Sequence, residues 1–339
     1  MTDAVERRKA EHLEICLNRP MAEVEYSGMT TGFERYAFEH CALPEMNLAD
    51  VDISTRSLGR SLSMPLMIAC MTGGTPRGGE INRNLAIAAQ KLGIAMGVGS
   101  QRAALEDSSL ISTYQVRDVA PDILLVANLG AAHLTDDMAC KAVEMIGADA
   151  LAIHLNPVQE ALQPDGDPSF KGVLDAIRRV CEGLEAPVIA KEVGFGVSAE
   201  VAVMLRDAGV AAIDVAGAGG TSWARIEGIR ALGRLQELAS QFEDWGIPTA
   251  RSLEEVQAAV PDLPLIASGG VRTGLDIAKA LALGADLTAV GLPLLHEAAK
   301  SAEAVEEWIL ARADELRLAM FGVGTRTTED LRKSRLGQV

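Results

Sequence analysis

Short apolar segments alternate with longer amphipathic segments along most of the chain. The apolar segments are expected to form strands, and they cover residues 64–70, 94–99, 122–128, 149–155, 187–193, 211–217, 264–270 and 287–292. The stretches between them predict helices at residues 80–92, 107–119, 136–145, 172–182, 199–207, 253–260 and 275–283. This alternation is typical of βαβ units that build a parallel sheet.

The number of strands favours a closed barrel over an open sheet. Eight strands are the count of a (β/α)8 TIM barrel, and no strand is followed by the GxGxxG turn of a dinucleotide-binding sheet. We therefore expect an α/β protein with a single domain over residues 1–339, made of an N-terminal extension (1–60), a barrel core (61–300) and a C-terminal helical tail (301–339). Residues 221–251 are too many for a simple loop and predict a long insertion between the sixth strand and the sixth helix.

Charge and cysteine content narrow the class of protein. The chain carries a net charge of −16, which argues against a nucleic-acid partner because such binding needs Lys and Arg to displace counterions. Its five cysteines have no metal-ligand spacing, so we expect free thiols in a reducing cytoplasm. The charged N-terminal segment lacks the apolar core of a signal peptide, and no segment has about 18 uninterrupted apolar residues, so we expect neither export nor a membrane span.

Polar residues and glycines follow all of the predicted strands. In a βα barrel the active site lies at the carboxyl ends of the strands, so these positions are the candidate site. They are Met71 to Gly74, Ser100 to Arg102, Asn128, His154 to Glu160, Lys191, Asp214 to Thr221, Ser268 to Gly274 and Ala289 to Gly291.

Two glycine-containing turns after the last two strands indicate a phosphorylated ligand. Gly269, Gly270 and Arg272 lie in the sequence SGGVRTG, and Gly291 follows the eighth strand. Glycines let backbone N–H groups approach phosphate oxygens, and these two loops form the usual phosphate site of a barrel. Tight turns that need glycine for a positive φ are the alternative interpretation.

Other charged residues suggest more chemistry at the same end. Lys191 lies in an apolar strand, where an unpaired ammonium is costly, so it is a Schiff-base lysine, a lysine that faces a flavin, or half of a structural ion pair. The sequence HLNPVQE places an imidazole, two amides and a carboxylate in one loop, on His154, Asn156, Gln159 and Glu160.

A basic cluster stands near the N-terminus of this acidic chain. Arg7, Arg8 and Lys9 are followed by His12. The cluster is either an anion-binding element or the solvated face of a helix, and the pattern alone leaves both open.

Taken together in their order, the motifs closely resemble type 2 isopentenyl-diphosphate isomerases, an FMN-dependent family. The blocks are RKAEHL, MTGG, GSQR, NLG, HLNPVQE, AKEVGFG, AGGTSWARIE, SGGVRTG and AVGLPLL, and they extend from Arg8 to Leu295. SGGVRTG is shared with other FMN barrels and supports only the cofactor. HLNPVQE and the N-terminal RKxxH element carry the specificity of the resemblance.

The resemblance implies an isomerase of isoprenoid biosynthesis that interconverts isopentenyl diphosphate and dimethylallyl diphosphate by a 1,3-allylic proton shift. It implies FMN, used in its reduced form as an acid/base, and Mg²⁺ to bind the diphosphate. NADPH or NADH would reduce the flavin without any net redox change in the substrate. A homo-oligomer, commonly a tetramer or octamer, is also implied.

The family's binding residues carry over to this sequence in three groups. FMN is expected at Ala69, Met71, Thr72, Ser100, Asn128, Lys191, Thr221, Gly269, Gly270, Arg272, Ala289 and Gly291. The substrate is expected at Arg8, Lys9, His12, Arg102, His154, Asn156 and Gln159. The metal is expected at Glu160.

Four residues receive more specific roles. We expect Gln159, His154 and Lys191 to be the catalytic group: Gln159 positions the substrate, His154 holds the diphosphate as a cation, and Lys191 stabilises the anionic reduced flavin. The guanidinium of Arg272 is expected to meet the FMN phosphate.

Two alternatives remain open at this point. Another FMN barrel, such as a 2-hydroxy-acid oxidase or a dihydroorotate-type dehydrogenase, would share the phosphate loops and the lysine. A non-catalytic flavin- or phosphate-binding barrel would not need the polar HLNPVQE loop.

Overall fold

The computed structural model describes residues 2–164 and 166–339, and its centre is a closed barrel of parallel strands. In the barrel each strand pairs with the next along the chain, and β11 closes the ring by pairing with β4. The strands are β4 (Leu66–Ile68), β5 (Ala95–Gly97), β6 (Leu125–Gly130), β7 (Ala150–Leu155), β8 (Val188–Glu192), β9 (Ala212–Asp214), β10 (Leu265–Ala267) and β11 (Leu287–Val290). Each overlaps the apolar segment that predicted it, so the (β/α)8 TIM barrel is confirmed.

A ring of helices surrounds the barrel, and most of them match the predicted ranges closely. They are α3 (Pro76–Leu92), α5 (Asp136–Ile146), α7 (Val173–Gly183), α8 (Ala199–Asp207), α11 (Thr249–Ala259) and α12 (Gly274–Ala282). Their ends follow ordinary capping chemistry. In α5, for example, the Thr135 side chain accepts a hydrogen bond from the Met138 N–H, and Gly147 ends the helix with a φ of 60°.

The prediction of one helix at residues 107–119 is wrong. The chain there forms α4 (Arg102–Glu106) and a 3-10 helix, η3 (Ser108–Thr113). Asp107 separates the two because its backbone is extended, with φ −136° and ψ 105°, and its side chain accepts a hydrogen bond from the Ser109 N–H. Ser, Thr and Asp compete with a regular helix in this way through local hydrogen bonds.

The interior of the barrel is packed with apolar side chains, among them Met67, Val126, Ile189 and Leu287. A hairpin of β2 (Thr55–Ser57) and β3 (Arg60–Leu62) contributes Leu62 to this cluster. The hairpin precedes β4, so it packs against the amino ends of the strands and leaves the carboxyl ends free for a site.

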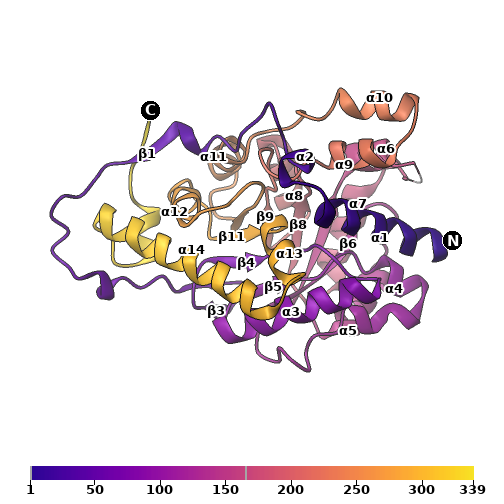
Figure 1. The fold of residues 1–339 in the computed structure, drawn as a ribbon, viewed down its shortest axis with the longest axis horizontal. Coiled ribbons are helices and arrows are strands. Elements are labelled where there is room, and N and C mark those ends of the chain that lie inside the picture. The colour runs from indigo at the N-terminus through magenta and orange to yellow at the C-terminus, as the bar shows by residue number, and fades with distance from the viewer. Residues whose placement is uncertain (1, 165) are drawn as a thin grey trace.

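The two ends of the chain meet in a small sheet outside the barrel. The N-terminal extension contains α1 (Thr2–Asn18), α2 (Met21–Val24), η1 (Phe33–Arg35), β1 (Tyr36–Phe38) and η2 (Leu48–Asp50). The C-terminal part contains α13 (Leu292–Ala298), α14 (Ala302–Val323), α15 (Thr328–Arg332) and β12 (Leu336–Gln338). Strand β12 pairs antiparallel with β1, and the C-terminus accordingly lies close to β1 in Figure 1. The tail after residue 301 was expected to be helical only, and it ends instead in a strand whose partner lies some 300 residues earlier in the chain.

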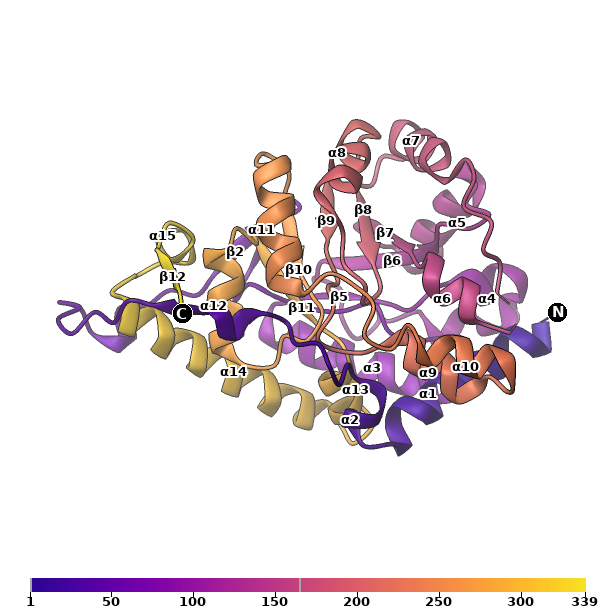
Figure 2. The ribbon, with the colours of Figure 1, turned by 90° about the horizontal axis from the view of Figure 1, so that it is seen from above.

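The insertion after the sixth barrel strand folds into two helices, α9 (Trp223–Arg230) and α10 (Arg234–Ser240). Helix α9 contacts α1 and also the short helix α6 (Pro157–Leu162), which follows the fourth barrel strand. Figure 2 shows α1, α9 and α10 together on one side of the molecule. Residues from the N-terminal extension and the insertion are thereby brought to the carboxyl ends of the barrel strands. Within the described part of the chain, no helix is both long and apolar enough to cross a membrane.

Candidate active site

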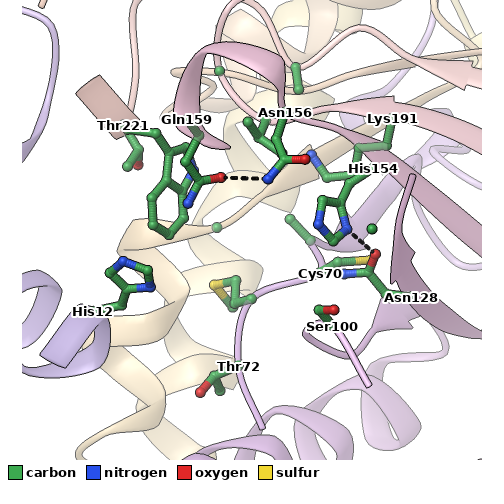
Figure 3. Close-up of a pocket in the computed structure, with 18 of the residues that line it drawn as sticks. His12, Cys70, Thr72, Ser100, Asn128, His154, Asn156, Gln159, Lys191 and Thr221 are labelled. Carbon is green, nitrogen blue, oxygen red and sulfur yellow. Dashed lines mark hydrogen bonds between the residues drawn. The ribbon is translucent and has the colours of Figure 1, made fainter. Parts of the chain in front are cut away.

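A cavity of about 280 Å³ lies at the carboxyl ends of the barrel strands. Its wall is built by the strand ends, the loops after them, α1 and α9. Every residue that the sequence resemblance assigned to FMN, to the substrate or to the metal lines this one cavity. These residues come from positions between Arg8 and Gly291, and the fold brings them together (Figure 3).

Three neighbouring strands place charged or titratable side chains at one level of the barrel. His154 of β7 is in register with Lys191 of β8, and Lys191 is in register with Asp214 of β9. The Lys191 Nζ donates to the Glu192 carbonyl at 2.7 Å and lies 3.5 Å from the Asp214 Oδ2. The Ser268 hydroxyl donates to the Asp214 Oδ1 at 2.6 Å. Lys191 therefore lines the cavity and also forms an ion pair, and sequence reasoning assigned no role to its partner Asp214.

The surroundings of His154 favour its neutral form. Its Nδ1–H donates to the Asn128 Oδ1 at 2.9 Å, as Figure 3 shows. Burial, together with the positive charges of Lys191 and Lys9, lowers the pKa of His154 to about 3. That His154 holds a bound diphosphate as a cation stays a prediction, in which the anion has to offset burial and these two positive charges.

Helix α6 turns a cluster of amides and one carboxylate towards the cavity. The Asn156 Nδ2 donates to the Gln159 Oε1 at 3.2 Å and to the Glu160 Oε1 at 3.0 Å. The Glu160 Oε2 accepts from the Asp167 N–H at 2.8 Å. Among the described residues no group of three His, Cys, Asp or Glu side chains could hold a metal ion. A cation at Glu160 would thus take its other ligands from water and from the bound substrate.

Glu227 is a central residue that sequence reasoning missed. Its carboxylate is completely buried and accepts from the Gln159 Nε2 at 3.2 Å, from His12 Nε2 at 2.9 Å and from Arg230 at 2.6 Å. Burial alone would raise the pKa of Glu227, but the hydrogen bond from His12 and the charge of Arg230 lower it. Glu227 is the last residue of the AGGTSWARIE block, but sequence reasoning gave it no role.

The basic N-terminal cluster belongs to the cavity and not to a solvated face. The Lys9 Nζ donates to the Ser100 carbonyl at 2.8 Å and lies 5.5 Å from the centre of the Tyr114 ring. Burial, together with the neighbouring charge of Arg8, lowers the pKa of Lys9 to about 7. Arg7 differs from these two because it is exposed and pairs with Glu11.

His12 closes the cavity on the side of α1. Its ring packs edge-on against Trp223 with the ring centres 5.1 Å apart, and its Nε2 bonds to Glu227. His12 therefore lines the cavity, where the resemblance places it among the substrate-binding residues.

The glycine turns form a cradle that fits a phosphate. Gly269 and Gly270 have φ values of 97° and 76°, which disfavour other residues, and a Cβ on Gly270 would stand 2.5 Å from the Gly219 oxygen. None of the hydrogen bonds formed among the described residues uses the backbone N–H of Gly269, Gly270 or Gly291. These donors line the cavity and are free for an anion, so the residues present fit the phosphate of a flavin nucleotide.

Arg272 is placed differently from the expectation. Its guanidinium forms an ion pair with Glu25 and donates to the Val271 carbonyl at 3.0 Å. It lines the cavity, but its charge is already compensated, so the glycine N–H groups are the better candidates for direct phosphate contact.

A family model and several solved structures match this architecture. The family model of the FMN-dependent dehydrogenases matches residues 159–338. A lactate oxidase of Pediococcus acidilactici is similar in structure over 100% of this chain and 94% of its own, with a TM-score of 0.69 and 19% identity. A flavocytochrome b2 variant is similar over 96% of this chain and 82% of its own, with a TM-score of 0.71 and 19% identity. The fold and the matching model define a barrel of the FMN-dependent dehydrogenase type.

Curated relatives define the family more narrowly. A protein of Synechococcus sp. named isopentenyl-diphosphate delta-isomerase is 54% identical over 93% of this chain and 91% of its own length. Proteins of the same name from Xanthobacter autotrophicus and Cronobacter sakazakii are 54% and 51% identical, over 96% and 98% of this chain and 96% and 97% of their own lengths. The chain belongs to the isopentenyl-diphosphate delta-isomerase family. The resemblance drawn from the motifs is confirmed.

Proposed function

We propose that the protein interconverts isopentenyl diphosphate and dimethylallyl diphosphate by a 1,3-allylic proton shift, with reduced FMN and Mg²⁺. NADPH or NADH would bring the flavin to its reduced state. One observation carries the proposal: a single cavity combines the free N–H cradle of the glycine turns with Arg8 and Lys9 of α1. One phosphorylated cofactor and one diphosphate substrate can therefore bind side by side.

The chain's own residues account for cofactor binding. We assign the FMN phosphate to the backbone N–H groups of Gly269, Gly270 and Gly291, and the flavin ring to the region of Lys191 and Asn128. Lys191 keeps its position through Asp214 and supplies a positive charge there. When bound, reduced FMN supplies a group that can donate or accept a proton beside the alkene.

The diphosphate is assigned to the opposite wall. Arg8 and Lys9 supply positive charge, and Glu160 would bind the cation that accompanies the diphosphate. Remote binding of this kind can position the small apolar part of the substrate without polar groups next to its double bond. It also explains how a protein with a net charge of −16 binds a polyanion.

Gln159 and the apolar wall act on the reacting part of the substrate. The neutral amide of Gln159 is a poor base, so we assign it a role in orienting the substrate. Its hydrogen bonds to Asn156 and Glu227 fix its own orientation in the cavity. Trp223 and Leu13 also line the cavity. These side chains exclude water, which would quench a cation-like species formed during the proton shift.

The test is incubation with isopentenyl diphosphate, FMN, Mg²⁺ and NADPH, with detection of dimethylallyl diphosphate and omission of each component in turn. We expect product only when flavin, reductant and Mg²⁺ are all present. Product formation that is unaffected by omission of FMN would contradict the assignment of the cavity.

The metal assignment has its own test. Glu160→Gln removes a carboxylate oxygen that a hard cation prefers, so a higher Mg²⁺ concentration should be needed for half-maximal activity. FMN binding should not change, because the glycine cradle lies elsewhere. If the Mg²⁺ dependence of this variant equals that of the wild type, Glu160 is not the metal ligand.

The family resemblance also supports proposals about the setting of the enzyme. We propose a homo-oligomer, a tetramer or an octamer, located in the cytoplasm. The native mass in solution tests the first proposal, and a mass equal to that of one 35.8 kDa chain would contradict it.

A further inference from the structure

Two buried amide atoms in the wall of the cavity have no hydrogen-bond partner among the described residues. They are the Asn156 Oδ1 and the Gln163 Nε2. The side chains of Asn156 and Gln163 are only 3% and 6% exposed, and both line the cavity. Buried polar atoms are seldom left unpaired, because each loses its bonds to water without replacement. Their position in the cavity wall indicates that a ligand completes them.

The orientation of the Asn156 amide is determined by its neighbours. Its Nδ2 donates to both the Gln159 Oε1 and the Glu160 Oε1, so the reversed amide would set an oxygen against two acceptors. Figure 3 shows the bond between Asn156 and Gln159. The Oδ1 is therefore a fixed acceptor that is free to receive a donor from a ligand.

Gln163 is held beside Glu160 by the backbone. It ends helix α6, where its N–H donates to the Gln159 carbonyl at 2.9 Å and its carbonyl accepts from the Gly166 N–H at 3.0 Å. The chain turns back so tightly that a Cβ on Gly166 would stand 2.0 Å from the Glu160 carbonyl oxygen. The turn keeps the Gln163 side chain against the cavity with a free N–H.

The two free atoms are complementary to a hydrated cation with its diphosphate. Phosphate oxygens accept hydrogen bonds, so they need donors such as the Gln163 Nε2. A cation with Glu160 as its single carboxylate ligand keeps several water molecules, and these waters need acceptors such as the Asn156 Oδ1. Nothing else in the roles assigned above uses either atom.

We propose that Gln163 is a substrate-binding residue whose Nε2 donates to the diphosphate, while the Asn156 Oδ1 accepts from a water on the cation. The proposal rests on the proposed function, since it takes its ligand from there. The proposal predicts opposite effects on binding and on stability. The amide of Gln163 stabilises the complex with diphosphate, and its unpaired N–H lowers the stability of the unliganded protein.

The test uses Gln163→Met, which keeps the length of the side chain and removes the unpaired N–H, and Gln163→Glu, which places a negative charge against the diphosphate. Ala161→Glu is the matched control, because Ala161 is exposed on the same helix and the variant adds the same charge outside the cavity. The FMN-loaded proteins are titrated with inorganic diphosphate and Mg²⁺ in a calorimeter. Their melting temperatures are measured with and without diphosphate.

We expect Gln163→Met to weaken diphosphate binding by about tenfold and Gln163→Glu by more, with FMN affinity and the binding by Ala161→Glu unchanged. Without diphosphate, the Gln163→Met protein should melt at the wild-type temperature or above it. If Gln163→Met binds diphosphate as the wild type does, or if it melts lower and binds FMN more weakly, Gln163 is a structural residue and the proposal fails.

Failure of the proposed function gives a different result. A wild-type protein that binds inorganic diphosphate through Gln163 but forms no dimethylallyl product would contradict the isomerase and leave this proposal standing. A wild-type protein that binds no diphosphate would contradict both.

Discussion

At the scale of single residues, the cavity is prepared for an anion by burying its positive charges. Lys9 forms no ion pair with a carboxylate of the described residues, and the pKa of Lys9 is lowered to about 7. Burial also lowers the pKa of Arg8, although Glu160 and Glu227 partly oppose the effect. An incoming diphosphate replaces the lost hydration and favours the charged form of both side chains.

The lowered pKa of Lys9 predicts a pH dependence of substrate binding. In the free protein Lys9 loses its proton as the pH rises through about 7, and a bound diphosphate raises that pKa. Binding should therefore take up a proton, and affinity should fall from about pH 7 upwards. Calorimetric titration with Mg²⁺ and diphosphate at several pH values, in buffers of different ionisation enthalpy, measures both effects.

Lys9→Arg is the control for this pH dependence, because arginine stays protonated throughout the range. The free diphosphate also changes its protonation with pH, but this change is the same in the experiments with both proteins. The variant should show a flatter affinity profile and less proton uptake. Identical profiles for the two proteins would show that Lys9 does not titrate in this range.

Glu227 predicts a contrast between two carboxylates that bond to the same arginine. Arg230 pairs with Glu227, which is fully buried, and with Glu11, whose side chain is 43% exposed. Glu227→Gln should lower the free energy of unfolding by about 2 kcal/mol, because buried donors lose a charged acceptor. Glu11→Gln should cost about 0.5 kcal/mol or less, as exposed ion pairs contribute little. Chemical denaturation measures both, and equal losses would contradict the buried role of Glu227.

At the scale of elements, α1 is a separate wall of the active site. It contacts α9, α4, α2 and α13, and no barrel strand is among its main contacts. Hydrogen bonds from Lys9 to Ser100 and from His12 to Glu227 tie it to the rest of the protein. None of these hydrogen bonds reaches Gly269, Gly270 or Gly291 of the glycine cradle.

Removal of α1 should therefore separate the two binding sites. A protein that begins at Arg19 should still bind FMN, because the glycine cradle remains, but should lose most of its affinity for diphosphate along with Arg8 and Lys9. FMN fluorescence and diphosphate calorimetry are the two measurements. Loss of FMN binding in a truncated protein that keeps its helical circular dichroism would contradict this division.

Elements were predictable where local pattern determines them. The barrel strands were found because buried parallel strands are continuous apolar runs. The prediction of a helix at residues 107–119 was wrong because Asp107 caps a 3-10 helix and does not continue an α-helical turn. Strand β12 was missed because its partner β1 lies at the other end of the chain, and no local pattern records such a pairing.

Candidate site residues were predictable to the extent that a motif contained them. The HLNPVQE and SGGVRTG motifs supplied residues that line the cavity. Motifs did not show what these side chains bond to. The pairing of Arg272 with Glu25 and the lowered pKa of His154 depend on neighbours from distant segments and on burial.

At the scale of the whole molecule, an acidic chain forms one cavity with local positive charge. The residues that line it come from the N-terminal extension, all eight strand ends and the insertion after the sixth strand. The barrel supplies the phosphate cradle typical of its class, α1 and α6 supply groups that we assign to the diphosphate, and α9 supplies Trp223 and the Glu227 that holds Gln159. This division accounts for a dehydrogenase-like fold with an isomerase function.

The central claim is that the flavin is used without net oxidation or reduction of the substrate. The most direct measurement is the amount of dimethylallyl diphosphate formed per NADPH consumed, under anaerobic conditions with FMN and Mg²⁺. We predict many product molecules for each NADPH, because the reductant serves only to bring the flavin to its reduced state. One product molecule per NADPH, or NADPH consumption without dimethylallyl product, would contradict the account.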